Sequence, residues 1–162
     1  GRFMMEPMVL ARLIQSLQPQ AEEKAMVAAS GRGYGAALLA RLVKSVVAVE
    51  NEAGLATAAQ QTWQELGITN IQQVVGLPEL GATASGPFGV ILIEGAVREV
   101  SRAVLDQLAD GGRLATVVSD PSGSLGVAHL FVKQGGVASG RPLFDAGTSP
   151  LPGFTPPPKF TF

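Results

Sequence analysis

The sequence predicts a single α/β domain built on a doubly wound, mostly parallel β-sheet, with an antiparallel pair of strands at its C-terminal end. Three observations predict this class. Between residues 26 and 132, short apolar runs alternate with longer amphipathic stretches, as parallel strands joined by crossover helices require. The last two apolar runs leave no room for a helix between them. The 162 residues are 46% hydrophobic and 15% charged, which favours one compact core.

The first part of the chain predicts a helix, a strand, a glycine-rich turn, a second helix and a second strand. Apolar residues at three- and four-residue steps mark the first helix, and Pro7 suits its first turn. These apolar residues are Met8, Leu10, Leu13, Ile14 and Leu17. The elements that follow are a strand over 25–29, the turn 30–35, a helix over 36–43, and a β-branched strand over 45–49 that ends at Glu50.

The second part predicts another helix, two more parallel strands, a further helix and the final strand pair. Leu55, Ala59, Trp63 and Leu66 share one helical face, and Gly67 ends that helix. Strands are expected over 71–75 and 90–93. A second stripe, closed by Gly111 and Gly112, is made of Val97, Val100, Val104 and Leu108. The last strands, 114–118 and 127–132, are joined by the turn-forming residues 120–123.

The C-terminal tail is expected to form a unit of its own. Its prolines exclude regular structure from residue 147 onward, so we divide the chain into an α/β domain, 1–146, and an extended arm, 147–162. Phe154, Phe160 and Phe162 are expected to pin the arm to the body. A preformed extended segment loses little entropy on binding, so the arm is also a candidate docking site for a protein partner.

Composition excludes several classes of function. The chain has no cysteine, which excludes disulfides, thiol nucleophiles and thiolate metal sites. The single histidine, His129, cannot form a multi-histidine metal site and is expected at a surface or sheet edge. A formal net charge of −1 gives no basic field for nucleic acid. Without an apolar run of roughly 20 residues or a signal-peptide pattern, a cytoplasmic protein is expected.

A glycine-rich loop predicts a Rossmann-like nucleotide site. Ser30, Gly31 and Gly33 lie between a predicted strand and helix, and Glu50 ends the next strand. Glycines let the backbone approach a ligand, and the carboxylate can accept both hydroxyls of a ribose. Dinucleotide and S-adenosylmethionine sites share this arrangement. The alternative is that the glycines only allow a tight turn and that Glu50 is a solvated strand end.

Six segments together resemble protein-L-isoaspartate O-methyltransferases. They are residues 6–12, 31–40, 46–50, 66–71, 75–76 and 107–114, and they occur in the order of that family. The resemblance implies S-adenosylmethionine as cofactor and the carboxyl group of isoaspartyl residues in proteins as methyl acceptor. It places the cofactor at Ser30, Gly31, Gly33, Glu50, Gly76 and Leu77. Glu6 and Glu94 are expected on the substrate side, with a solvated strand end as the alternative for Glu94. No residue is assigned a catalytic role.

Four positions depart from the family pattern. Val27 stands where the family has an acidic residue that helps hold the methionine end of the cofactor, and Ala29 stands where it has a glycine. Leu77 replaces an aspartate that faces the adenine, and Met5 replaces a serine near the isoaspartyl group. These departures predict that cofactor binding is weak or lost. The alternative function is a non-catalytic scaffold or subunit of the same fold. A site for a nicotinamide nucleotide is a third, weaker hypothesis.

Overall fold

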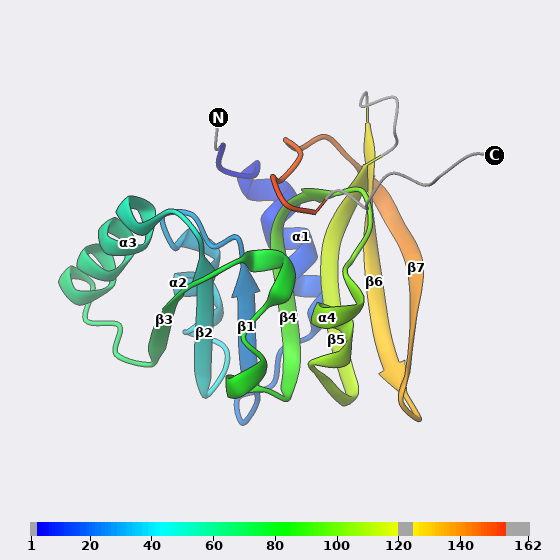
Figure 1. The fold of residues 1–162 in the computed structure, drawn as a ribbon, viewed down its shortest axis with the longest axis horizontal. Coiled ribbons are helices and arrows are strands. Elements are labelled where there is room, and N and C mark those ends of the chain that lie inside the picture. The colour runs from blue at the N-terminus through cyan, green and yellow to red at the C-terminus, as the bar shows by residue number, and fades with distance from the viewer. Residues whose placement is uncertain (1–2, 120–124, 155–162) are drawn as a thin grey trace.

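The computed structural model describes residues 3–119 and 125–154, which fold around one seven-stranded sheet (Figure 1). The strand order is β3-β2-β1-β4-β5-β6-β7. Strands β1 to β5 are parallel, and β6 and β7 are antiparallel to their neighbours. The predicted fold class is therefore confirmed. The strands are β1 Lys24–Ala28, β2 Ser45–Glu50, β3 Ile71–Val75, β4 Phe88–Val97, β5 Leu108–Ser119, β6 Gly126–Gln134 and β7 Val137–Ala146.

Helices cover both faces of the sheet and bury a separate apolar cluster on each. On one face lie α1 Pro7–Leu17, α2 Tyr34–Leu39 and α3 Ala53–Glu65. On the other lie α4 Arg102–Asp106 and the loop that holds two short 3₁₀ turns, η1 Pro78–Leu80 and η2 Thr83–Ser85. In Figure 1, α1 passes behind β4 and α4 stands in front of β5. Strands buried on both faces explain the nearly continuous apolar runs of β1, β2 and β4.

Helices α1 and α2 were predicted, with differences in detail. In α1, Pro7 occupies the first turn as expected, but Met8 is 67% exposed and Val9 takes the buried position. Helix α2 begins at Tyr34 and ends at Leu39, four residues before the predicted end. Beyond Leu39 the chain continues in tighter turns, and the side-chain amide of Asn70 donates to the carbonyl oxygen of Ala40 at 2.9 Å.

The predicted helical stripe from Val97 to Leu108 is wrong. Strand β4 continues to Val97, and Leu108 already belongs to β5, so only α4 between them is helical. The residues Gly111 and Gly112 do not end a helix. They lie in an irregularity at the start of β5, where a Cβ on Gly112 would stand 2.8 Å from the carbonyl oxygen of Ala109.

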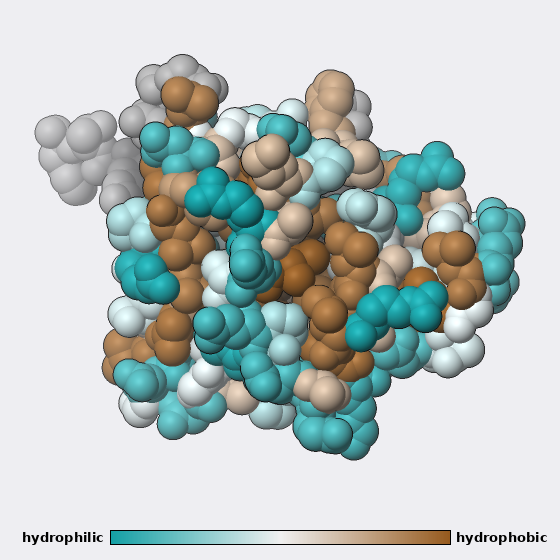
Figure 2. Space-filling model, turned by 180° about the vertical axis from the view of Figure 1, so that it is seen from behind, coloured by the Kyte–Doolittle hydropathy of each residue, from teal (hydrophilic) through white to brown (hydrophobic). Residues whose placement is uncertain are grey.

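Strand β7 was not predicted. It pairs with β6 along nine residue pairs and forms one edge of the sheet, so most of its side chains are exposed. Pro142 is compatible with this position because an edge strand can spare one backbone donor. Near the same edge, the Arg12 guanidinium of α1 lies 3.6 Å from the ring centre of Phe144. Figure 2 shows this side of the molecule, where apolar strips are separated by hydrophilic side chains.

Part of the predicted C-terminal arm packs on the body of the domain. We call residues 147–154 the strap. The amide of Ala96 donates to the carbonyl oxygen of Ser149, and the amide of Leu151 donates to the carbonyl oxygen of Ala96, at 3.1 and 2.7 Å. Leu151 and Phe154 are buried with the residues of the α4 face. The predicted contacts of Phe160 and Phe162 lie outside the described residues.

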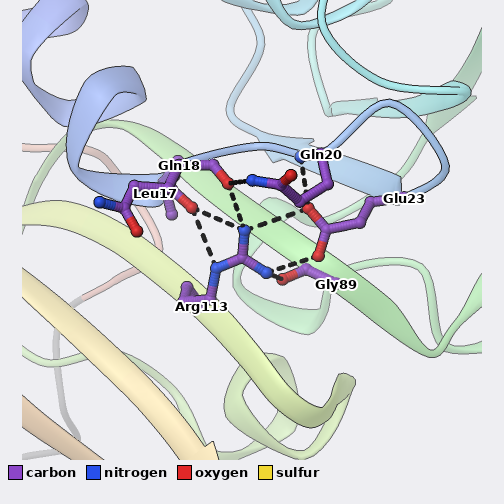
Figure 3. Close-up of polar contacts among 6 residues, drawn as sticks. All are labelled: Leu17, Gln18, Gln20, Glu23, Gly89 and Arg113. Atoms are coloured by element: carbon purple, nitrogen blue, oxygen red, sulfur yellow. Dashed lines mark hydrogen bonds and ion pairs between the residues drawn. The ribbon is translucent and has the colours of Figure 1, made fainter.

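One arginine joins the start of the domain to its centre (Figure 3). Arg113 of β5 donates to the carbonyl oxygens of Leu17 and Gln18 at the end of α1, each at 2.7 Å. It also forms a two-point ion pair with Glu23, at 2.5 and 3.1 Å. The backbone amide of Gln20 donates to the same carboxylate at 2.8 Å. Burial raises the pKa of Glu23, but the bonds from Arg113 and Gln20 outweigh it and leave the pKa below its usual range.

Candidate functional site

A cavity of about 160 Å³ opens at the carboxyl ends of β1 and β4. Strand β1 is followed by β2 on one side, and the chain later returns to place β4 on the other side. Such a reversal of strand order leaves a crevice at the carboxyl ends of the strands, where α/β proteins bind ligands. The cavity lies beside the loop that follows β1. Its lining residues are Phe3, Met4, Ala29, Ser30, Gly31, Arg32, Tyr34, Leu55 and Glu94.

The loop after β1 is held in a tight turn by backbone hydrogen bonds, one within the loop and one to β2. The amide of Ser30 donates to the carbonyl oxygen of Val49 at 3.1 Å, and the amide of Gly33 donates to that of Ser30 at 2.8 Å. Gly31 has a φ of 55° and Gly33 one of 81°, which suits glycine. Ala29 has a φ of 58°, although it carries a side chain. Ala29 stands where the resembled family has a glycine, and the backbone conformation at this position is one that glycine adopts more readily.

The Ser30 hydroxyl is an uncompensated polar group. It is buried, and the described part of the chain offers it no hydrogen-bond partner. Burying a hydroxyl without a partner costs about 1–3 kcal/mol, so such a group in a binding site is a candidate ligand contact. Ser30 lines the cavity, and a polar ligand there would compensate this cost.

Glu50 is coupled to the glycine loop. Its side chain is fully buried, and its two carboxylate oxygens accept the backbone amides of Gly31 and Glu52 at 2.7 and 3.0 Å. The alternative prediction, a solvated strand end, is wrong for this residue. Glu50 does not line the cavity itself, but it contacts Gly31, which does.

Gly33 has a structural role that the sequence did not reveal. The indole nitrogen of Trp63 donates to the carbonyl oxygen of Gly33 at 3.0 Å, and a Cβ on Gly33 would collide with the indole ring. This contact packs α3 against the loop. Gly33 does not line the cavity, so its predicted contact with a cofactor stays a prediction.

The other residues predicted for the site, Gly76, Leu77 and Glu6, lie outside the cavity. Gly76 lies beside Glu50, because its amide donates to the Glu50 carbonyl oxygen at 3.0 Å. Leu77 follows it and is 51% exposed, and Glu6 is an exposed residue at the start of α1. Val27 and Met5, two of the positions that differ from the family pattern, are buried in the apolar cluster under α1.

Glu94 lies at the cavity wall, but it lies inside β4 and not after it, because this strand continues to Val97. It is 8% exposed, so the alternative of a solvated strand end is wrong. A Cβ on Gly35 would stand 2.5 Å from its Oε2 atom, so the glycine leaves space for the carboxylate. Phe3, Met4, Tyr34 and Leu55 were not predicted for the site. Tyr34 and Leu55 follow the glycine loop and Glu50 closely in sequence, and this proximity was the available signal.

The donor types at this site suit an organic ligand. Within residues 3–119 and 125–154, no group of three or more histidine, aspartate or glutamate side chains is placed to hold a metal ion. Over the same ranges, no helix has the length and apolar character needed to cross a bilayer. The cavity combines a buried hydroxyl, a carboxylate, a guanidinium and apolar side chains. Its volume is below the roughly 300–1,000 Å³ of most small-molecule sites, so it suits a small ligand or one end of a larger one.

Comparison with known proteins identifies the family. Residues 1–143 match the family model for protein-L-isoaspartate(D-aspartate) O-methyltransferase. A protein-L-isoaspartate O-methyltransferase of Koribacter versatilis is 34% identical over 153 residues, covering 94% of this chain and 68% of the relative. Another, from Syntrophobacter fumaroxidans, is 40% identical over 115 residues, covering 71% of this chain and 54% of the relative.

Solved structures agree with this assignment. A protein-L-isoaspartate O-methyltransferase superposes with a TM-score of 0.84 at 25% identity, covering 91% of this chain and 47% of that one. A Plasmodium falciparum structure described as a putative member, in complex with S-adenosyl-L-homocysteine, gives a TM-score of 0.67 at 21% identity. It covers 88% of this chain and 70% of that one, and shows a shared fold. The chain belongs to the protein-L-isoaspartate O-methyltransferase family.

Proposed function

We propose that this chain binds S-adenosylmethionine at the carboxyl ends of β1, β2 and β4 and donates the methyl group to a protein carboxyl group. The observation that carries the proposal is the coupling of Glu50 to Gly31 beside a cavity that contains the buried Ser30 hydroxyl. A carboxylate fixed next to a glycine turn is the arrangement that binds a ribose in α/β folds. The relatives named above supply the reaction class.

Within this proposal, each part of the site has a separate task. Glu50 accepts ribose hydroxyls, as a carboxylate at this strand end does in α/β nucleotide sites. Gly31 allows the ligand to approach the backbone, and Ser30 donates or accepts one hydrogen bond inside the cavity. When bound, the cofactor would supply an electrophilic methyl group for transfer to an acceptor carboxylate oxygen.

We further infer that cofactor affinity is low. Val27 is a core residue, so it does not supply the charged cofactor contact expected at its position. Met5, also in the core, does not supply the substrate contact expected at its own. One lost charge-assisted hydrogen bond is worth about 1.5–3 kcal/mol, which is roughly a ten- to hundredfold loss of affinity. Leu77 offers apolar contact but no acceptor for an adenine amino group. A cytoplasmic location and a protein or peptide substrate remain predictions from the sequence and the family.

The experiment that tests the proposal is calorimetric titration with S-adenosylhomocysteine. Micromolar to submillimolar binding is expected for the unsubstituted chain, with at least tenfold weaker binding for Glu50→Gln. The matched control is Glu65→Gln, because Glu65 is an exposed residue of α3 outside the cavity. No heat at millimolar ligand, from a chain that is folded by circular dichroism, would contradict the proposal.

A second candidate function is a non-catalytic scaffold or subunit of the same fold. The observation that favours it is the burial of Met5 and Val27, which turns two polar positions of the family into core packing. Transfer of labelled methyl groups from S-adenosylmethionine to an isoaspartyl peptide separates the two functions. Transfer above the rate of a Glu50→Gln control supports the enzyme, whereas binding without any transfer supports the scaffold.

A further inference from the structure

A carboxylate and a guanidinium share the cavity at the end of β1 and β4. Glu94 lines it from β4, and Arg32 lines it from the glycine loop. The Ser30 hydroxyl, buried and without a partner among the described residues, belongs to the same lining. One acidic group, one basic group and one hydroxyl match a zwitterion, in which an ammonium and a carboxylate are separated by one carbon atom.

The register between β1 and β4 places Glu94 close to Val27 on the same face of the sheet. Strands β1 and β4 are parallel neighbours, and Val27 lies opposite Leu92. Both side chains belong to the apolar cluster under α1, and Glu94, two residues after Leu92, faces the same side of the sheet. The carboxylate of Glu94 therefore lies on the neighbouring strand, on the face to which Val27 points and nearer the carboxyl ends.

The local packing makes room for this carboxylate. Gly35 in α2 lies against Glu94, and a Cβ there would approach Oε2 to 2.5 Å. Glu94 is 8% exposed, so its charge interacts with a bound cation through less water than a surface carboxylate does. Arg32 is exposed and can reach an anion at the cavity entrance. An ammonium at Glu94 and a carboxylate at Arg32 would thus be bound by opposite charges.

We propose that this cavity is the subsite for the α-amino-acid end of the cofactor, with Glu94 binding the ammonium and Arg32 the carboxylate. Glu94 thereby offers an acidic group from β4 where β1 has Val27, which offsets part of the affinity lost at that position. This inference rests on the proposed function, since it assumes that an S-adenosyl ligand binds. The cavity volume suits this end of the ligand, and Gly31 connects the cavity to Glu50, where the ribose would lie.

The test compares two ligands that differ only at the amino-acid end. S-adenosylhomocysteine carries this end, and 5′-methylthioadenosine lacks it. The unsubstituted chain should bind S-adenosylhomocysteine at least tenfold more tightly. Glu94→Gln and Arg32→Gln should each weaken binding of S-adenosylhomocysteine about tenfold and leave binding of 5′-methylthioadenosine unchanged. The controls are Glu65→Gln and Arg41→Gln, which make the same changes of charge at exposed residues outside the cavity.

Each result decides between the two proposals. Equal affinities for both ligands, or unchanged S-adenosylhomocysteine binding in both site variants, would overturn the amino-acid subsite and leave nucleotide binding intact. Parallel loss of both ligands in Glu94→Gln would also overturn it, because the residue would then support the fold of the site. Since Arg32 is exposed, Arg32→Gln tests the carboxylate half without a risk to folding. Binding of neither ligand to the unsubstituted chain would overturn both proposals.

Discussion

Ala29 occupies a backbone conformation that normally favours glycine. Its φ is 58°, and a left-handed conformation costs an L-residue with a Cβ about 1–2 kcal/mol. Glycine would remove this strain, but it would also lose a buried methyl group, worth about 0.8 kcal/mol, and gain unfolded-state entropy, worth about 0.4–1 kcal/mol. The opposing effects are of the same size, so Ala29→Gly should change the free energy of unfolding by less than about 0.5 kcal/mol.

The matched comparison is Ala28→Gly, at the last residue of β1, directly before Ala29. Ala28 is equally buried but lies in a regular strand with no positive φ, so its replacement relieves no strain. It should lose about 1.5 kcal/mol from the buried methyl group and the unfolded-state entropy. Urea unfolding of the three proteins measures both changes. Equal destabilisation by the two substitutions would show that the left-handed turn at Ala29 costs nothing.

At the scale of single residues, the sequence predicted the residues of the glycine loop but not all of the side chains that surround the cavity. Ser30 and Gly31 were predicted and line the cavity, because a strand–glycine–helix order fixes where they lie. Glu94 also lines it, although β4 does not end before it as predicted. Phe3 and Met4 were not predicted. They are far from the loop in sequence, and only the path of the chain before α1 brings them to it. Leu77 was predicted but lies outside the cavity, because its side chain turns toward solvent after β3.

At the scale of elements, periodicity predicted the parallel strands and failed where two elements share one pattern. Val97 and Leu108 match a helical stripe with Val104, yet each belongs to a strand that flanks α4. Pairing of Val97 with Val118 in β5 decides this assignment, and a local pattern cannot show it. Strand β7 was missed for a different reason. As an exposed edge, it contains Gly140 and Pro142, which sequence patterns associate with loops.

The strap is expected to be part of the cooperative fold. Leu151 is buried against Gly95 of β4, and a Cβ on Gly95 would collide with the leucine side chain. Leu151→Ala should therefore lower the free energy of unfolding by about 2–3 kcal/mol, as for other buried leucines. The matched control is Leu42→Ala, at a leucine that is 44% exposed, with an expected loss below about 1 kcal/mol. Chemical unfolding measures both.

The alternative for this element is the separate arm predicted from its prolines. If residues 147–162 form an independent docking arm, Leu151→Ala should match the control, since no core contact is lost. The strap would then resemble a linker and not a structural element. A docking function for residues 155–162 lies outside the described residues and stays a prediction. Deleting 155–162 and measuring partner capture leaves the strap intact and tests only that function.

At the scale of the whole molecule, hydrophobic alternation was sufficient to predict the order of layers, because it reflects burial on two faces. It could not predict the polar contacts that join distant segments. The bonds from Arg113 to Leu17 and Gln18 connect residues more than ninety positions apart in sequence. Nothing in the local pattern around Arg113 or Glu23 indicates that they meet. Such pairs depend on the completed sheet, which places the start of β5 beside the end of α1 (Figure 3).

This ion pair makes the stability of the fold depend on pH. The pKa of Glu23 is lowered in the folded chain, so the unfolded chain takes up the proton first as the pH falls. Glu23 therefore stabilises the fold at pH values above its usual pKa, and this stabilisation is lost as the pH falls through the lowered value. At pH 7, Glu23→Gln should lower the free energy of unfolding by about 1.5–3 kcal/mol, the contribution of a hydrogen bond to a charged group.

The decisive measurement is the difference in unfolding free energy between the unsubstituted chain and Glu23→Gln, determined in urea at pH 7 and pH 3. This difference should shrink at pH 3, because the unfolded chain has then taken up the proton that the lowered pKa of Glu23 disfavours in the folded chain. Glu65→Gln controls for the loss of one negative charge, since Glu65 is an exposed residue of α3. A difference that stays constant between the two pH values would mean that the carbonyl contacts of Arg113 hold α1 in place without the ion pair.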